Sequence, residues 1–234
     1  MAVEAWSRLT REIVDCRRCP RLRRHCETVA RVKRRAFRDE EYWGKPVPGF
    51  GDARARVLLV GLAPAAHGAN RTGRMFTGDD SGNWLYAALH RAGLGSRAVA
   101  TGAGDGLLLR GAFITAAARC APPGNKPSPA ELAACAPFLD REIELLREVR
   151  VVVALGKIAW DTVLRRAVRI DPASVVSPRP RFAHLAETTI ALRRPGTRIA
   201  LLGSYHPSRQ NTNTGRLTRA MLDAALARAV ALSA

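Results

Sequence analysis

The chain has 234 residues, 47% of them hydrophobic, and no apolar run of the roughly 18 residues that a membrane-spanning helix needs. Its 38 Lys and Arg residues outweigh 20 Asp and Glu residues, for a net charge of +18. Such a surface attracts polyanions, so nucleic acid is the expected partner, although an arginine-biased genome would explain part of the excess. The N-terminus is charged from Glu4 onward and lacks the apolar segment of a signal peptide, which predicts a cytoplasmic location.

The first half of the chain predicts a helix, a basic segment, a strand and a second helix. The helix covers about 3–15, and the densely basic segment runs from Arg17 to Arg38. RVLLVG (56–61) is a short apolar, β-branched run typical of a buried parallel strand. SGNWLYAALHRAGL (81–94) has apolar residues on one helical face, with Ser81 as the expected N-cap.

The second half continues the alternation. A strand is expected at 112–119, a helix at 128–149 with Ser128 and Pro129 at its start, a strand at 151–156 and a helix from 157. A fourth strand is expected at 198–208 and a last helix at about 216–230, whereas 169–195 shows no clear periodicity. This order predicts an α/β fold, a three-layer α/β/α sandwich around a central four-stranded parallel sheet. We expect one domain over 1–234, with a basic helical N-terminal extension over about 1–50.

In such sheets the ligand-binding crevice lies at the carboxyl ends of the strands, which singles out four loops. They follow Gly61, Arg119, Gly156 and Ser204. The first, GLAPAAHGANRTGRMFTGDD (61–80), has neither the spacing nor the lysine of a phosphate-binding loop. The chain also lacks the G-x-S-x-G, H-E-x-x-H and G-x-G-x-x-G patterns, which argues against the common hydrolase, zinc-protease and dinucleotide-binding classes.

Four of the five cysteines have a spacing that suits a metal centre. Cys16 and Cys19 form a C-x-x-C turn, Cys120 ends the second strand, and Cys135 lies in the next helix. Four thiolates can hold zinc or an iron–sulfur cluster, and the wide second spacing favours a [4Fe-4S] cluster. The alternative is buried free thiols, which is the interpretation adopted for Cys26.

Two strand-end loops present polar side chains. In CAPPGNKPSP (120–129), prolines on both sides stiffen a turn that offers the donor and acceptor of Asn125, although an ordinary turn asparagine would look the same. In GSYHPSRQNTNTG (203–215), Pro207 keeps His206 extended, and the polar residues that follow could contact phosphates. A single strand-end histidine is also often structural.

Five segments together resemble the iron–sulfur family 5, or type b, of the uracil-DNA glycosylase superfamily. They are CRRCP (16–20), RAFRDEEYWGKPVPGFGD (35–52), GLAPAAHGANRTGRMFTGD (61–79), CAPPGNKP (120–127) and GSYHPSRQNTNTGRLT (203–218). The resemblance covers nearly the whole chain. It implies a DNA repair enzyme that flips uracil out of the helix and hydrolyses its N-glycosidic bond, leaving an abasic site in base excision repair.

The resemblance also implies site residues. Asp79 would act on water or the sugar cation, and His206 would stabilise charge on the leaving base. The base would be bound by Phe76, Asn125, Gly61 and Ala63. DNA contacts are expected from Arg209, Asn211, Asn213 and Arg74. The [4Fe-4S] ligands would be Cys16, Cys19, Cys120 and Cys135.

The first loop departs from most of the superfamily, because Ala63, Pro64, Ala65 and Ala66 cannot orient a water molecule. This resembles the type b branch and branches of broader range, so hypoxanthine and other altered bases are expected substrates besides uracil. The roles of Asp80 and His67 stay open. The main alternative is a non-catalytic nucleic-acid-binding protein with a four-cysteine zinc site, and a third possibility is an RNA-directed enzyme. We expect a monomer without membrane contact that associates with the nucleoid through its DNA substrate.

Overall fold

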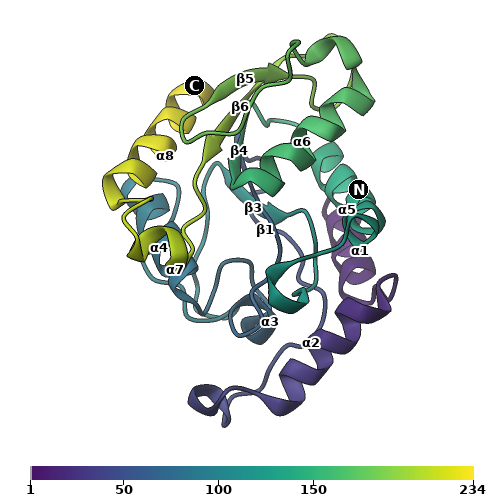
Figure 1. The fold of residues 1–234 in the computed structure, drawn as a ribbon, viewed down its shortest axis with the longest axis vertical. Coiled ribbons are helices and arrows are strands. Elements are labelled where there is room, and N and C mark those ends of the chain that lie inside the picture. Colours follow the sequence, from purple (N-terminus) through teal and green to yellow (C-terminus); the bar gives the residue numbers. More distant parts are fainter. Residues whose placement is uncertain (1) are drawn as a thin grey trace.

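A computed structural model describes residues 2–234 and contains one six-stranded sheet in the order β1-β3-β2-β4-β6-β5 (Figure 1). The four central strands are parallel, as predicted. They are β3 (Ala112–Ala116), β2 (Val57–Gly61), β4 (Val151–Leu155) and β6 (Ile199–Ser204). Their carboxyl ends therefore meet at one edge, where the four predicted loops leave the sheet.

The prediction missed two antiparallel edge strands, so the sheet is mixed rather than purely parallel. They are β1 (Phe50–Gly51), paired with β3, and β5 (Glu187–Ile190), paired with β6. The first has only two residues, and the second lies in the 169–195 segment with three of its four residues not buried. Neither has the continuous apolar run by which a buried strand is recognised.

Eight α-helices and three short 3-10 turns accompany the sheet within residues 2–234. The helices are α1 (Ala2–Val14), α2 (Pro20–Val32), α3 (Ala69–Thr72), α4 (Asp80–Arg91), α5 (Pro129–Leu145), α6 (Lys157–Ile170), α7 (Arg209–Asn213) and α8 (Arg219–Ser233). The 3-10 turns are η1 (Arg35–Phe37), η2 (Pro123–Asn125) and η3 (Pro172–Ser174). Ser128 caps α5 as expected, in a capping box with Glu131. The expected cap of α4 was wrong: Asp79, not Ser81, is its N-cap.

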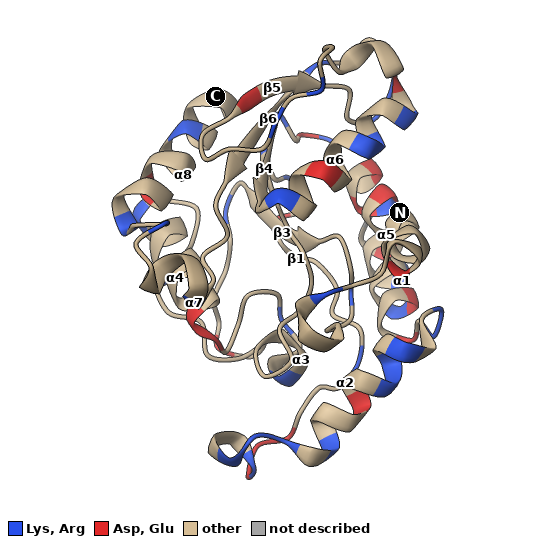
Figure 2. Cartoon of the chain, in the orientation of Figure 1, with Lys and Arg blue, Asp and Glu red and all other residues tan. Residues whose placement is uncertain are grey.

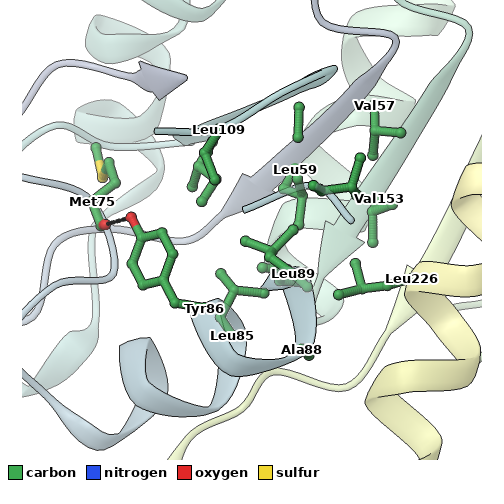
Figure 3. Close-up of a cluster of buried hydrophobic side chains, with 14 of the residues drawn as sticks. Val57, Leu59, Met75, Leu85, Tyr86, Ala88, Leu89, Leu109, Val153 and Leu226 are labelled. Carbon is green, nitrogen blue, oxygen red and sulfur yellow. Dashed lines mark hydrogen bonds between the residues drawn. The ribbon is translucent and has the colours of Figure 1, made fainter. Parts of the chain in front are cut away.

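The core has two halves, one on each face of the sheet, which confirms the three layers. Alternate side chains of β2 point to opposite faces, so Val57 and Leu59 pack with α4 and α8 while Leu58 and Val60 pack with α5 and α6. Figure 3 shows the first half, where side chains of β2, β4, α4 and α8 meet. Both faces of the parallel strands are covered, so their carboxyl edge is the part left open for a site.

The N-terminal helices pack beside α5 and the exit of β3. Leu9 and Ile13 of α1 contact Phe138 of α5, and Leu22 and Cys26 of α2 contact the 120–121 turn. Lys and Arg gather along α2 and the loop after it (Figure 2). The helices of the described chain include none that is both long and apolar enough to cross a bilayer.

Candidate active site

A cavity of about 290 Å³, here called the base pocket, opens at the carboxyl edge of the parallel strands. Its walls come from the loops after β2, β3 and β6 and from the start of α4. The lining residues are Leu62, Ala63, Pro64, Ala65, Ala69, Phe76, Asp79, Ser81, Asn125, His206, Ser208 and Gln210. The fold thus brings five of the six predicted catalytic and base-binding residues into one cavity.

Phe76 is held in a backbone conformation that a bulky side chain rarely adopts, with φ of 54°. The preceding residue anchors it, because the buried Tyr86 hydroxyl donates a 2.7 Å hydrogen bond to the Met75 carbonyl (Figure 3). The Phe76 ring lies 5.5 Å from the His206 ring, centre to centre. This arrangement presents a flat apolar face to the pocket.

Gly61 does not line the base pocket but makes room for Phe76. A methyl group added at Gly61 would lie 2.9 Å from the Phe76 ring, closer than packed carbon atoms tolerate. The predicted base-binding role of Gly61 is therefore indirect in this structure, since the residue seats the ring that faces the pocket.

Asp79 joins the first turn of α4 to the opening loop. Its Oδ1 accepts a 2.9 Å hydrogen bond from the Gly82 N–H, which is the N-cap contact. Its Oδ2 lies against Gly68, where an added methyl group would come within 2.3 Å. Burial, followed by the nearby charge of Asp80, raises the pKa of the Asp79 carboxyl. A carboxylate that is partly desolvated and rigidly placed can act on a water molecule or on a developing cation.

Asp80 and His67, whose roles the sequence left open, both have other partners. Asp80 pairs with exposed Arg209 and does not line the base pocket. His67 lies outside the pocket too, with its Nδ1 3.0 Å from the Tyr42 hydroxyl. Of the two adjacent carboxylates, only Asp79 therefore reaches the cavity.

His206 follows β6 and is neutral at physiological pH, because burial lowers its pKa to about 4. A neutral imidazole still donates one N–H. The Asn211 amide donates a 2.8 Å hydrogen bond to the His206 carbonyl and so fixes the turn that carries the ring. Asn211, predicted to contact DNA, has its amide nitrogen engaged inside the protein.

Asn125 occupies the tip of the proline-rich loop with φ of 57°, directly after Gly124 with φ of 60°. Its backbone is in the left-handed region, which asparagine tolerates better than most residues. Its side chain is exposed at the pocket and makes no hydrogen bond to any residue that the structure describes. The amide is therefore free to bind a ligand.

The DNA-contact prediction for Arg74 is wrong. Only 4% of its side chain is exposed, and it forms two hydrogen bonds, of 2.8 and 2.6 Å, to the Asp105 carboxylate. The guanidinium also lies over the rings of Phe50 and Tyr86. The ion pair with Asp105 holds it in the interior.

Arg209 and Asn213 are exposed beside the pocket, and their DNA contacts stay predictions. Seven further lining residues were not among the predicted site residues: Leu62, Pro64, Ala65, Ala69, Ser81, Ser208 and Gln210. For Ser208 and Gln210 the sequence did offer a signal, because both lie in the same loop as His206, within four residues of it. These two residues lie at the start of the short helix α7, which was not predicted from the sequence.

A second, narrow cavity lies where α1, α2, α5 and the end of β3 meet. It is lined by all four predicted ligands, Cys16, Cys19, Cys120 and Cys135, and we call it the cysteine cavity. Its remaining lining residues are Arg18, Leu22, Arg23, Pro46, Arg119, Ala134 and Phe138. Among the described side chains, no three His, Cys, Asp or Glu form a group arranged for a single metal ion. Four thiols around one enclosed space nevertheless fit the donor set of an iron–sulfur cluster.

The thiols of the cysteine cavity are buried to different extents, with Cys120 buried and the other three partly buried. Burial raises the pKa of Cys19, and it raises the pKa of Cys135 to about 11. A hydrogen bond with Cys26, together with burial, raises the pKa of Cys120. Cys26 itself is fully buried against Ala121 and does not line the cavity. Its side chain is hydrogen-bonded to Cys120, and its exclusion from the ligand set stays a prediction.

The chain matches known proteins over most of its length. The family model described as "Uracil DNA glycosylase superfamily" matches residues 48–229. A "Type-5 uracil-DNA glycosylase" of Mycobacterium bovis is 56% identical over 209 residues, which is 89% of this chain and 74% of the relative. One of Thermus thermophilus is 54% identical over 89% of this chain and 90% of the relative. A "Type-4 uracil-DNA glycosylase" of Pyrobaculum aerophilum is 31% identical over 72% of this chain and 74% of the relative.

The type-5 relatives are far more similar to this chain than the type-4 relative, and the family model spans both the sheet and the loops of the base pocket. The resemblance expected from the sequence motifs is confirmed. The chain belongs to the uracil-DNA glycosylase superfamily, with its type-5 members as relatives.

Proposed function

We propose that the base pocket performs the uracil-DNA glycosylase reaction of this family, in which uracil is removed from DNA as a step of repair. The observation that carries the proposal is the convergence of four chemical groups in one cavity. A stacking ring, a free amide, a neutral imidazole and a buried carboxylate come from Phe76, Asn125, His206 and Asp79. A base must leave the double helix to enter a pocket of this kind.

In this proposal the extruded base lies against Phe76 and is recognised by Asn125. Stacking on an aromatic ring is worth about 1–3 kcal/mol per base. It does not depend on which base is bound, so discrimination falls to the amide of Asn125, which can both donate to and accept from the edge of uracil. Ala63 adds only a methyl group to the wall, which leaves the base pressed close to the loop backbone.

Cleavage of the N-glycosidic bond places negative charge on the base and positive charge on the sugar. The neutral His206 can donate its N–H to an oxygen of the departing base without first losing a proton. Asp79 can offset the sugar cation and orient the attacking water, because the alanines and proline of the 63–66 stretch carry no polar side chain for that task. The reaction then ends with free base and an abasic sugar.

The cysteine cavity suits a [4Fe-4S] cluster held by its four thiols. When bound, such a cluster would supply cross-links between the N-terminal helices and the end of β3, since its ligands come from both. This ties the N-terminal extension to the sheet, and we propose that 1–234 works as one domain for that reason. Asn125 is five positions beyond Cys120 in the same loop, so the cluster would also stiffen one wall of the base pocket.

A broader substrate range than uracil is a further part of the proposal. The 63–66 stretch offers no side chain that would hydrogen-bond or exclude a particular base, so hypoxanthine and xanthine are candidate substrates. The zinc-binding, non-catalytic alternative is not favoured, because it leaves the four converging groups of the base pocket without a role. Monomeric state and a cytoplasmic, nucleoid-associated location stay predictions.

The test uses iron-loaded protein, purified without air, and duplexes that carry one uracil, hypoxanthine or xanthine opposite each normal base. Abasic sites are revealed as strand breaks in hot alkali, at a stated salt concentration because phosphate contacts are salt-dependent. We expect cleavage at uracil and none in a matched thymine duplex. Absence of breaks at uracil would overturn the proposal, and breaks at uracil alone would overturn only the broader range.

A further inference from the structure

Three buried side-chain nitrogens without a hydrogen-bond acceptor belong to two arginines that line the cysteine cavity. They are the Nε of Arg23 and both Nε and Nη1 of Arg119. A buried donor without a partner costs on the order of 1–3 kcal/mol, so folded proteins rarely leave one in place. Three around one small space indicate that the space is built for a group that accepts hydrogen bonds.

The Arg119 guanidinium is hydrogen-bonded through Nη2 and not through its other two nitrogens. Its side chain is 1% exposed, and its Nη2 donates a 2.6 Å hydrogen bond to Glu142, which is equally buried. Glu142 also accepts from the Thr115 hydroxyl at 2.5 Å and from the Gly49 N–H at 3.1 Å. These contacts lock the guanidinium in position while two of its nitrogens stay without a partner.

Arg23 shows the same pattern at the opposite wall. It lies in the first turn of α2, whose N-cap is Cys19, and both side chains line the cavity. Its Nη1 donates to the Gly44 carbonyl at 3.2 Å and its Nη2 to Glu27 at 2.9 Å. The Nε alone is left without an acceptor.

The charge of the cavity points to an anion. Arg18, Arg23 and Arg119 all line it, whereas its lining includes no Asp or Glu. Glu142 and Glu27 pair with Arg119 and Arg23 from outside the lining, so only cationic side chains face the cavity, and an anion is the ligand they favour. A cluster with four thiolate ligands has net negative charge, and its sulfur atoms accept hydrogen bonds, which tune such clusters.

We propose that Arg23 and Arg119 are positioning residues for the cluster: their free N–H groups donate to its sulfur atoms and offset its negative charge. The inference rests on the [4Fe-4S] cluster of the proposed function. The two arginines then have two effects on the cluster. The bound cluster is held more tightly, and its more negative, reduced state is favoured, so the midpoint potential is higher than without them.

The test compares single-site variants of the whole protein, loaded with iron under nitrogen. Arg23→Met removes one donor and leaves Glu27 exposed to water, so no buried charge is stranded. Arg24→Met is the matched control, because it removes the same charge from an exposed neighbour on α2 that does not line the cavity. For Arg119 the variant is Arg119→Met combined with Glu142→Gln, which avoids an unpaired buried carboxylate.

Three quantities are measured: iron per chain, the rate of iron release to a chelator, and the midpoint potential by voltammetry. We expect Arg23→Met to release iron about tenfold faster, as loss of one charge-assisted hydrogen bond would produce, and to shift the potential downward. The Arg119 and Glu142 double variant should shift it in the same direction, with Arg24→Met like the wild type. A thermal melt of each protein separates cluster effects from general unfolding.

Two results would overturn the inference in different ways. If wild-type protein holds iron but both cavity variants match Arg24→Met in release rate and potential, the arginines have no role toward the cluster, and the proposed cluster stands. If the wild type itself binds no iron under these conditions, the cluster fails and this inference with it. Uracil excision, measured beside these quantities, reports on the base pocket independently.

Discussion

The base pocket and the cysteine cavity share one loop, yet they are built in opposite ways. The base pocket is open, and its ring, amide and imidazole have no hydrogen-bonding side-chain partner among the described residues. The cysteine cavity is narrow and enclosed, and its arginines are fixed by carboxylates and backbone carbonyls. A site that must bind and release a base keeps its groups free, whereas a site that retains a cofactor fixes them before it binds.

Backbone strain is also found in the base pocket and not in the cysteine cavity. Of the non-glycine residues described with positive φ, Phe76 and Asn125 line the base pocket, and the two others, Lys33 and Leu185, lie in neither cavity. A residue in that region costs about 1–3 kcal/mol unless its surroundings impose it. The pocket therefore stores backbone strain to aim its two base-contacting side chains, and the cysteine cavity does not.

The largest effect on the base pocket should come from Asp79→Asn. Asparagine caps a helix as well as aspartate does, so the fold and DNA binding should persist. Without the carboxylate, we expect uracil excision under single-turnover conditions to slow by about 100-fold or more. Because burial raises the pKa of Asp79, the wild-type rate should rise with pH through a midpoint above the ordinary aspartate range. An unchanged rate in Asp79→Asn would show that its role is only that of a cap.

For the cysteine cavity, the sharpest contrast is between Cys135→Ala and Cys26→Ala. Cys135 lines the cavity, and Cys26, although more deeply buried, does not. Protein purified without air should carry about four irons per chain in the wild type and in Cys26→Ala, and far less in Cys135→Ala. Iron analysis and the broad visible absorption are the measurements. Iron loss in Cys26→Ala would mean that the ligand set is wrong.

Gly68→Ala tests whether close approach of the backbone places Asp79. The added methyl group would lie 2.3 Å from the Asp79 Oδ2, so the carboxylate must move. A displacement of this size can cost about 100-fold in rate while leaving iron content unchanged. Gly102→Ala is the matched control, since nothing lies within 4 Å of the added group there. Equal excision rates in the two variants would contradict the placement.

The smallest expected effect is on acid stability and involves His206. Its pKa is lowered to about 4 in the folded chain, against about 6.5 when unfolded, so in this window the unfolded state binds more protons. The contribution of His206 to stability is therefore full above about pH 6.5 and falls as the pH drops toward 4, by about 2 kcal/mol at pH 5. In His206→Gln this loss should vanish, which urea unfolding at pH 7 and pH 5 would reveal. Parallel losses in both proteins would argue against a buried, neutral histidine.

Much of this architecture was predictable because local patterns carry it. The apolar runs at 56–61 and 151–156 became β2 and β4, and the Ser128–Pro129 start of α5 has the expected cap. The short edge strands β1 and β5 were not predictable, since their residues pair with the sheet without a continuous apolar run. The same holds for Arg74, whose burial depends on Asp105, 31 positions away.

The sequence by itself determined the fold class, the family and the residue types of both sites, because periodicity and motif spacing are local properties of the chain. Only the tertiary structure decided which groups meet. It placed Asp79 rather than Asp80 at the pocket, put Gly61 beneath Phe76, and turned Arg23 and Arg119 toward one cavity with the cysteines. These contacts join segments that are far apart in the sequence. The burial that they produce exists only once the chain has folded.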